Sequence, residues 1–310
     1  MADQLKGLFG VGTHKLDNTD YQIIYQIRLP RIILAAVVGA ALACAGVTLQ
    51  AILRNPLADP YILGISSGAA LGIIIATVSG VTMTFWAGSA RSFCAFCGAF
   101  GTVWLVWFIG YSAAASGTVT SLLLAGVVIN AFFSAIIMFL TSIASSEQVR
   151  EIALWLMGNI TDRSVEILLL SVFCIIGGLL ILMAIAHKLN VLTLGNTEAK
   201  ALGINTQRIK LVAFAVSAFI TAIAVSLTGL IGFVGLIVPH GVRLVVGPDH
   251  RQLLPMSAFV GAAFLVITDT IARSVFCGSE LPVGIITALV GGPFFLILLV
   301  KHSKKVSWAK

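Results

Sequence analysis

The residues of this chain that could do chemistry are few and scattered. The five histidines stand at positions 14, 187, 240, 250 and 302. Cys94 and Cys97 form one C-x-x-C pair without a second pair or neighbouring histidines, so they lack the ligand set of a zinc site. A membrane enzyme needs a cluster of nucleophile, base or metal ligands. The sequence therefore predicts no catalytic residue, no metal and no cofactor.

A nucleotide site is also missing from the sequence. The segment GISSGAALG, Gly64–Gly72, is rich in glycine but lacks the lysine of the GxxxxGK[ST] loop, whose backbone N–H groups cradle phosphates. That loop occurs nowhere in the chain. If ATP drives this protein, hydrolysis belongs to another polypeptide.

Asp269 is the one carboxylate well inside an apolar run. Ion-coupled secondary transporters carry such carboxylates near the middle of the membrane, and this function is the main alternative. Asp269 lies toward the end of its run, however, and Arg273 follows four residues later. An i,i+4 ion pair with a structural role is therefore the favoured interpretation.

The elements that must position these residues are membrane helices. The chain is 59% hydrophobic and 10% charged, whereas soluble domains carry about 25% charged residues. Its apolar runs approach the roughly 20 residues that cross a bilayer as a helix, and they are continuous rather than alternating as in barrel strands. We predict an all-α polytopic transmembrane helix bundle in one domain, residues 1–310, with about nine spans. These are Ile32–Leu53, Ile62–Val81, Phe93–Tyr111, Ser121–Ala144, Val165–Ala186, Ile209–Leu230, Phe233–Val246, Leu253–Phe276 and Val283–Val300.

Several glycines lie inside these runs. Small residues let membrane helices approach closely where no hydrophobic force drives them together. We therefore expect helix crossings at Gly39, Gly46, Gly68, Gly72, Gly98 and Gly101.

The orientation follows from lysine and arginine, which short cytoplasmic loops retain. If the spans alternate, Arg54, Lys188, Lys200 and the C-terminal lysines share one face, so that face is predicted to be cytoplasmic. Nine spans then place residues 1–27 outside the cytoplasm, and no cleavable signal peptide is visible there.

The net charge of +7 lies at span ends, where it meets lipid headgroups. The positive residues therefore do not form a pattern that would bind nucleic acid.

The segment LGNTEAKALGINTQR, Leu194–Arg208, is a polar island between two apolar runs. Asn196 or Thr197 is an expected N-cap, and Gly203 is placed to end a helix of about two turns. A helix this short is marginal in water. It either covers the end of the bundle or binds a partner.

Five blocks of sequence, in order, resemble the permease subunits of type II ABC importers for iron-siderophores, haem and cobalamin. The first is RLPRIILAAVVGAALACAGVTLQAILRNPLADPYILGISSGAALG, Arg28–Gly72, and the third is the polar island. The others are LLLAGV, Leu122–Val127; GFVGLIVPHGVRLVVGPDHRQLLP, Gly232–Pro255; and ELPVGIITALVGGPFFLILL, Glu280–Leu299.

This resemblance implies a homodimer in the bacterial inner membrane that works with cytoplasmic ATPase subunits and an extracytoplasmic substrate-binding protein. Members of the family have ten spans, so this chain is expected to begin after the first. Either it is truncated or its start is misassigned, which is the favoured interpretation, or it works with nine spans and an external N-terminus. The family's coupling helix, which docks on the ATPase, corresponds here to Glu198, Ala199, Lys200, Ala201, Leu202 and Gly203.

The resemblance also implies a gate and an outer helix. Thr118, Val119 and Thr120 match the family's gate at the cytoplasmic end of a span, although the threonines could equally cap the helix that follows. The segment EQVREIALWLMGN, Glu147–Asn159, is too short and too charged to span a membrane and resembles a short external helix.

Three arginines match those of the family that meet acidic residues of the binding protein: Arg28, Arg31 and Arg273. Arg28 and Arg31 are three residues apart and can share one helical face, and a guanidinium suits two-pronged contact with a carboxylate. Pairing with lipid headgroups at the membrane surface is the alternative.

Overall fold

The structure, a computed structural model, describes residues 21–81, 84–85, 88–112, 119–161, 164–275 and 280–307. Most of the predicted N-terminal segment, residues 1–20, lies outside this part of the chain, as does Thr118 of the predicted gate. The described residues form the following elements, in chain order: η1 (Ile23–Arg28), α3 (Leu29–Leu53), η2 (Pro60–Leu63), α4 (Ile65–Val78), β1 (Thr84–Phe85), β2 (Gly88–Ser89), α5 (Ala90–Ser112), α6 (Val119–Ile143), α7 (Ser146–Leu156), α8 (Val165–Ala184), α9 (Ala186–Leu194), α10 (Asn196–Ala201), α11 (Thr206–Thr228), α12 (Val234–Val246), α13 (His250–Ser274) and α14 (Val283–Ser307).

The predicted all-α bundle is confirmed. Each of the nine predicted apolar runs forms a helix in the described part of the chain, and the two strands, β1 and β2, are a two-residue antiparallel pair. Among the residues that the structure describes, six helices are long and apolar enough to cross a membrane. The three shorter apolar helices lie at Ile65–Val78, Val234–Val246 and Val283–Ile297.

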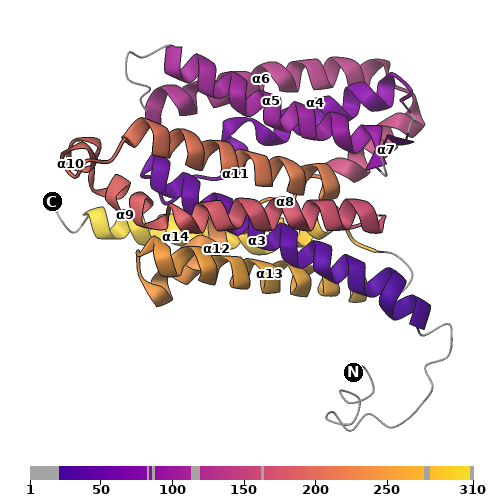
Figure 1. Cartoon of the computed structure of the whole chain (residues 1–310). Helices are drawn as coiled ribbons and strands as arrows, with labels where there is room; N and C mark the ends of the chain where they lie inside the picture. The colour runs from indigo at the N-terminus through magenta and orange to yellow at the C-terminus, as the bar shows by residue number, and fades with distance from the viewer. Residues whose placement is uncertain are drawn as a thin grey trace, which may run out of the picture.

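The helices run roughly side by side, so the bundle has two ends (Figure 1). One end, which we call the α10 end, carries α9, α10 and the C-terminus of α14. The opposite end, which we call the α7 end, carries α7 and the start of α3. The polar island therefore lies at one end of the long helices and the first residues of α3 at the other.

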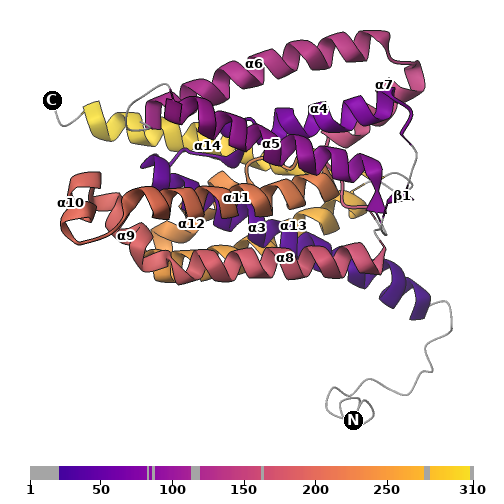
Figure 2. The ribbon, with the colours of Figure 1, turned by 45° about the horizontal axis from the view of Figure 1, so that its top comes forward.

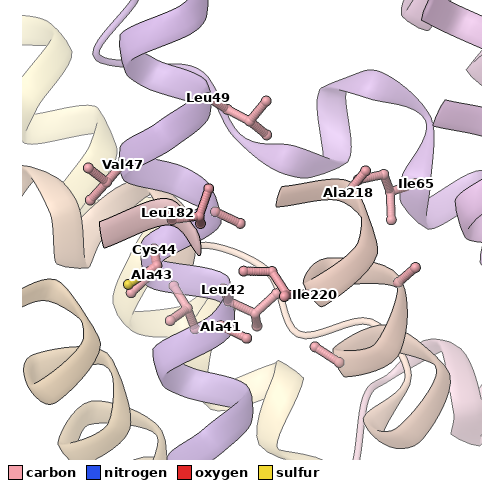
Figure 3. Close-up of a cluster of buried hydrophobic side chains, with 14 of the residues drawn as sticks. Ala41, Leu42, Ala43, Cys44, Val47, Leu49, Ile65, Leu182, Ala218 and Ile220 are labelled. Carbon is pink, nitrogen blue, oxygen red and sulfur yellow. The ribbon is translucent and has the colours of Figure 1, made fainter. Parts of the chain in front are cut away.

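The middle of the bundle is α3. In its most apolar 18-residue window, 78% of the residues are buried. Leu42 and Val47 share one apolar core with Leu182 of α8 and with Ile220 of α11 (Figure 3). The first helix also begins earlier than predicted, because the π-helix η1 runs directly into α3.

Glycines allow the backbones around α3 to touch. A Cβ atom at Gly261 of α13 would lie 2.5 Å from the carbonyl oxygen of Gly39 and 2.6 Å from Cβ of Ala43, which is closer than side chains pack. Similar contacts join Gly46 to Gly235 and Gly68 to Gly98. Close approach is thus confirmed at Gly39, Gly46, Gly68, Gly72 and Gly98, whereas Gly101 has no atom near its Cβ position, and the expectation there is wrong.

By contrast, α6 lies at the edge of the bundle in both views (Figures 1 and 2). Only 22% of its most apolar window is buried. Its outward face carries large apolar side chains, among them Leu124, Val127, Val128, Phe132, Met138 and Phe139.

Candidate coupling site, gate and docking surface

The polar island forms a compact turn of helix. After α9 ends at Leu194, Gly195 turns the chain with φ +151°, and α10 begins at Asn196. The expected N-cap at Asn196 or Thr197 is therefore wrong, because Gly195 holds that position without a side-chain cap.

Gly203 ends this helix as predicted. Its φ is +77°, a left-handed conformation that costs glycine little. Its N–H donates to the carbonyl of Lys200, and the N–H of Ile204 donates to that of Ala199. These two bonds make a Schellman motif, which satisfies carbonyl groups at the helix end.

The predicted coupling residues divide by exposure. Ala199 is fully buried, at 0% exposure, and joins the main apolar core. Leu202 is 64% exposed. The side chain of Ala199 thus anchors α10 and cannot contact a partner, whereas the surface is formed by Glu198, Lys200, Ala201, Leu202 and Gly203.

Arg54, which the sequence did not single out as a site residue, connects α3 to this region. It is the C-cap of α3, with φ +47° and ψ +37°. Its Nε donates to the carbonyl of Leu192 at 3.1 Å, and a terminal nitrogen donates to Oδ1 of Asn196 at 3.2 Å. One guanidinium therefore links the end of α9 and the start of α10 to α3.

Asn190 connects α9 to α13 in a similar way. Its Nδ2 donates to Oδ1 of Asp249 at 2.6 Å, and its Oδ1 accepts from the backbone N–H of His250 at 2.8 Å. Asp249 is the N-cap of α13 and also accepts from the N–H of Arg251. These bonds to the charged form lower the pKa of Asp249, so it is a carboxylate at neutral pH.

The predicted gate is described only in part. Thr118 lies outside the described residues, Val119 begins α6, and Thr120 is exposed. Farther along α6, Asn130 donates to the carbonyl of Ile62 at 3.4 Å and accepts from the hydroxyl of Ser67 at 2.5 Å. Val119 and Thr120 of the predicted gate thus lie in the first turn of α6, a helix that these polar contacts hold near its middle.

A cluster of charged residues lies at the α7 end between α3 and α13. Arg31 is only 8% exposed, and its guanidinium donates to both oxygens of Asp269 at 3.1 to 3.2 Å and to Glu280 at 2.9 Å. Nε of Arg273 lies 3.2 Å from Oδ2 of Asp269, an ion pair without hydrogen-bond alignment. The predicted Asp269–Arg273 pair is confirmed, and Arg31 is a third member that the sequence did not place there.

The three predicted docking arginines therefore differ in position. Arg28 is exposed, Arg273 is half-buried and Arg31 is buried. The expectation that Arg28 and Arg31 share an outward face is wrong, because Arg31 turns toward Asp269. Arg28 ends the π-helix η1 and Arg31 follows in α3.

The segment after α6 is a helix too short to span a membrane, as predicted. α7 has 11 residues and begins with a capping box between Ser145 and Gln148, and Glu151 pairs with Arg91 of α5 at 2.8 Å. An open apolar groove of about 480 Å³ lies beside it, lined by Leu156, Met157, Leu230, Gly232, Phe233, Gly284, Ile285, Ala288 and Leu289.

No metal-binding group was found in the part of the chain that the structure describes: no three His, Cys, Asp or Glu side chains there lie close together. Cys94 and Cys97 lie on α5 as free thiols.

A bundle of apolar helices with an exposed short helix at one end and a charged cluster at the other defines a polytopic membrane permease. A solved metal-chelate type ABC transporter in an inward-facing conformation has the same fold, with a TM-score of 0.84 and 36% identity over 94% of this chain and 91% of that one.

The chain belongs to the FecCD transport family, whose profile matches residues 2–301. It is 46% identical to the cobalamin import system permease protein BtuC of Halobacterium salinarum, covering 89% of this chain and 73% of that protein. It is 40% identical to the hemin transport system permease protein HmuU of Yersinia pestis, covering 93% and 86%. Its relatives are transport components rather than enzymes, and in a bacterium such a protein lies in the inner membrane.

Proposed function

We propose that this chain is the permease of an ATP-driven importer that carries a metal chelate inward. The observation that carries the proposal is α10, a helix of six residues whose exposed face is held in place by buried contacts from beneath. Leu202 gives this face an exposed apolar side chain that a partner would cover. A separate cytoplasmic ATPase that binds this surface would supply the free energy for transport.

The proposed cargo is an iron-siderophore, haem or cobalamin. Relatives are named for cobalamin, hemin and iron(3+)-hydroxamate import, and these share a large ring or chelate around a metal. The apolar groove beside α7 suits the apolar face of such a cargo.

On the outer side, we propose that Arg28 and Arg273 meet acidic residues of a substrate-binding protein. Arg28 is free of hydrogen bonds and ion pairs among the described residues, so it is available to a partner carboxylate. Arg31 does not contact the binding protein in this proposal, because its guanidinium is already paired with Asp269 and Glu280. Its role is to hold this part of α3 and α13 in place.

Two copies of the chain are proposed to enclose the pathway, with lipid around them. The large exposed side chains of α6 supply an apolar surface for that contact. Thr118, Val119 and Thr120 would then form the cytoplasmic gate at the start of α6.

The ion-coupled secondary transporter is not favoured. A coupling carboxylate must bind and release its ion. Asp269 instead pairs with Arg31 and Arg273, and each arginine keeps its charge at any physiological pH.

The proposal is tested by purifying the full-length chain from membranes and measuring the ATPase that accompanies it. Leu202→Asp should reduce the recovered ATPase by about ten-fold or more, because it buries a charge at the contact. Leu202→Met keeps the volume and should recover the wild-type amount. The proposal is wrong if no ATPase accompanies the wild-type chain, or if Leu202→Asp recovers as much as wild type.

A further inference from the structure

We infer that Arg54 and Asn190 are positioning residues. They fix the ATPase-facing helix α10 to helices α3 and α13, so that movement of α10 is transmitted along these two helices to the α7 end of the bundle. The inference rests on the proposed function, since it assumes an ATPase that moves α10.

The backbone of Arg54 is the first observation. Its φ of +47° lies in the left-handed region, which glycine adopts far more easily than arginine. Helices commonly end with glycine in this conformation. The backbone of an arginine in this conformation is strained. The contacts of its side chain explain why the strain is maintained, because the guanidinium bonds to both Leu192 and Asn196.

The second observation is that a separate contact holds the same region to another helix. Asn190 lies on α9, one turn before Leu194, and bonds to Asp249 and His250 at the start of α13. The segment of α9 and α10 is therefore fixed to the ends of two helices, and not only to its chain neighbours α8 and α11.

The third observation is that α3 and α13 are joined along their length. Near the α10 end, the thiol of Cys44 donates to the carbonyl of Leu254 at 3.3 Å. In the middle, Gly39 and Gly261 bring the backbones into contact. At the α7 end, Arg31 and Asp269 form a buried ion pair. A pair so closely packed moves as one body, so displacement of α10 is carried to the surface around Arg28 and Arg273.

Arg54→Gly is the decisive variant. Glycine suits the φ of this position, so the melting temperature should stay within about 3 °C of wild type. A residue that only ended α3 could be replaced in this way without loss. The inference instead predicts that ATP-driven movement at the α7 end is lost, although the ATPase still binds and hydrolyses ATP.

Asn190→Ala removes the side-chain bonds between α9 and α13. It should reduce the ATP-driven movement at the α7 end, but by less than Arg54→Gly does. Lys188→Ala is the matched control. Lys188 is exposed on the same helix and makes no side-chain hydrogen bond or ion pair in the described part of the chain, so this variant should behave as wild type.

The movement is measured by spin labels on Ser274→Cys, at the exposed end of α13, in a chain whose native cysteines are replaced by alanine except Cys44, which is fully buried and keeps its bond to Leu254. Pulsed electron paramagnetic resonance reads the distance between the two labels of a dimer. It is recorded without nucleotide and after ATP hydrolysis has left ADP and vanadate trapped on the bound ATPase. Wild type should change distance, and Arg54→Gly should show about ten-fold less of the changed population.

The two ways of failing are distinct. If Arg54→Gly shows the wild-type change, the inference is wrong and the proposed function stands. If the wild-type chain binds no ATPase, the proposed function is wrong and the inference falls with it. If the wild-type chain binds the ATPase but shows no distance change with ATP, the inference is wrong and the proposed function stands.

Discussion

Helices α3 and α6 are both 25 residues long and apolar, yet α3 lies in the middle of the bundle and α6 lies at its edge. In its most apolar 18-residue window, α3 has 78% of its residues buried, whereas α6 has only 22% buried. The difference lies in the size of the side chains. α3 is rich in alanine and glycine, whereas α6 carries Phe132, Met138 and Phe139 toward the outside. Small residues permit backbone contact, and bulky ones remain available for lipid or a second subunit.

This contrast suggests that the two helices have different roles. α3, with α13, is a frame fixed by backbone contacts and a buried ion pair. α6 meets the bundle at fewer buried positions and carries the proposed gate.

The largest effect is expected for Gly261→Val, because the added carbons would overlap Gly39 and Ala43. Overpacking against backbone costs about 3 kcal/mol or more, so the variant should assemble poorly and lose most of its folded yield in detergent. The matched change Gly101→Val, in α5 with open space at its Cβ position, should fold as wild type. If both variants melt alike, close packing does not define the frame.

A smaller effect is expected for Asp269→Asn, because it leaves Arg31 buried without its full charge partner. Removing one member of a buried pair outright costs about 3 to 5 kcal/mol. Asparagine keeps the volume and an oxygen that accepts from Arg31, so the cost should stay below that range, and thermal unfolding should register it. Glu280→Gln is the control, since the Glu280 side chain is 52% exposed and a pair at the surface contributes about 1 kcal/mol or less. Loss of uptake in Asp269→Asn at unchanged stability and unchanged ATPase binding would instead favour ion coupling.

The smallest effect is expected for Arg28→Glu, at the exposed start of the frame. Reversing a charge at the rim of a contact slows association, by about ten-fold at low salt, and the difference should shrink as salt rises. The rate is measured by the binding of the isolated substrate-binding protein to the chain in nanodiscs. Arg28→Lys keeps the charge and should bind at nearly the wild-type rate. Equal rates for Arg28→Glu would remove Arg28 from the docking surface.

Much of the fold could be predicted from the sequence, because each apolar run is continuous and local. The crossings at five glycines were expected because small residues let membrane helices approach closely, but helical glycines without a contact, such as Gly101 and Gly177, carry the same local signal. Gly203 was also predictable, because the left-handed end of a helix is a local property of glycine.

The charged contacts could not be predicted, because they depend on distant parts of the chain. Arg31 meets Asp269 across 238 positions, and Arg54 meets Asn196 across 142. The helical spacing of Arg28 and Arg31 suggested a shared outward face, but the partner on α13 turned one of them inward. Arg54 offered one signal, a cation directly at the end of a long apolar run.

The central claim is that this chain moves cargo only when a separate ATPase acts on α10. The most direct measurement is uptake of cyanocobalamin, haemin or a ferric hydroxamate into liposomes that contain the purified chain, with its binding protein outside and ATP inside. Uptake of one of these compounds should require the ATPase and should fall to background with Leu202→Asp. Uptake by the chain without any ATPase would contradict the account.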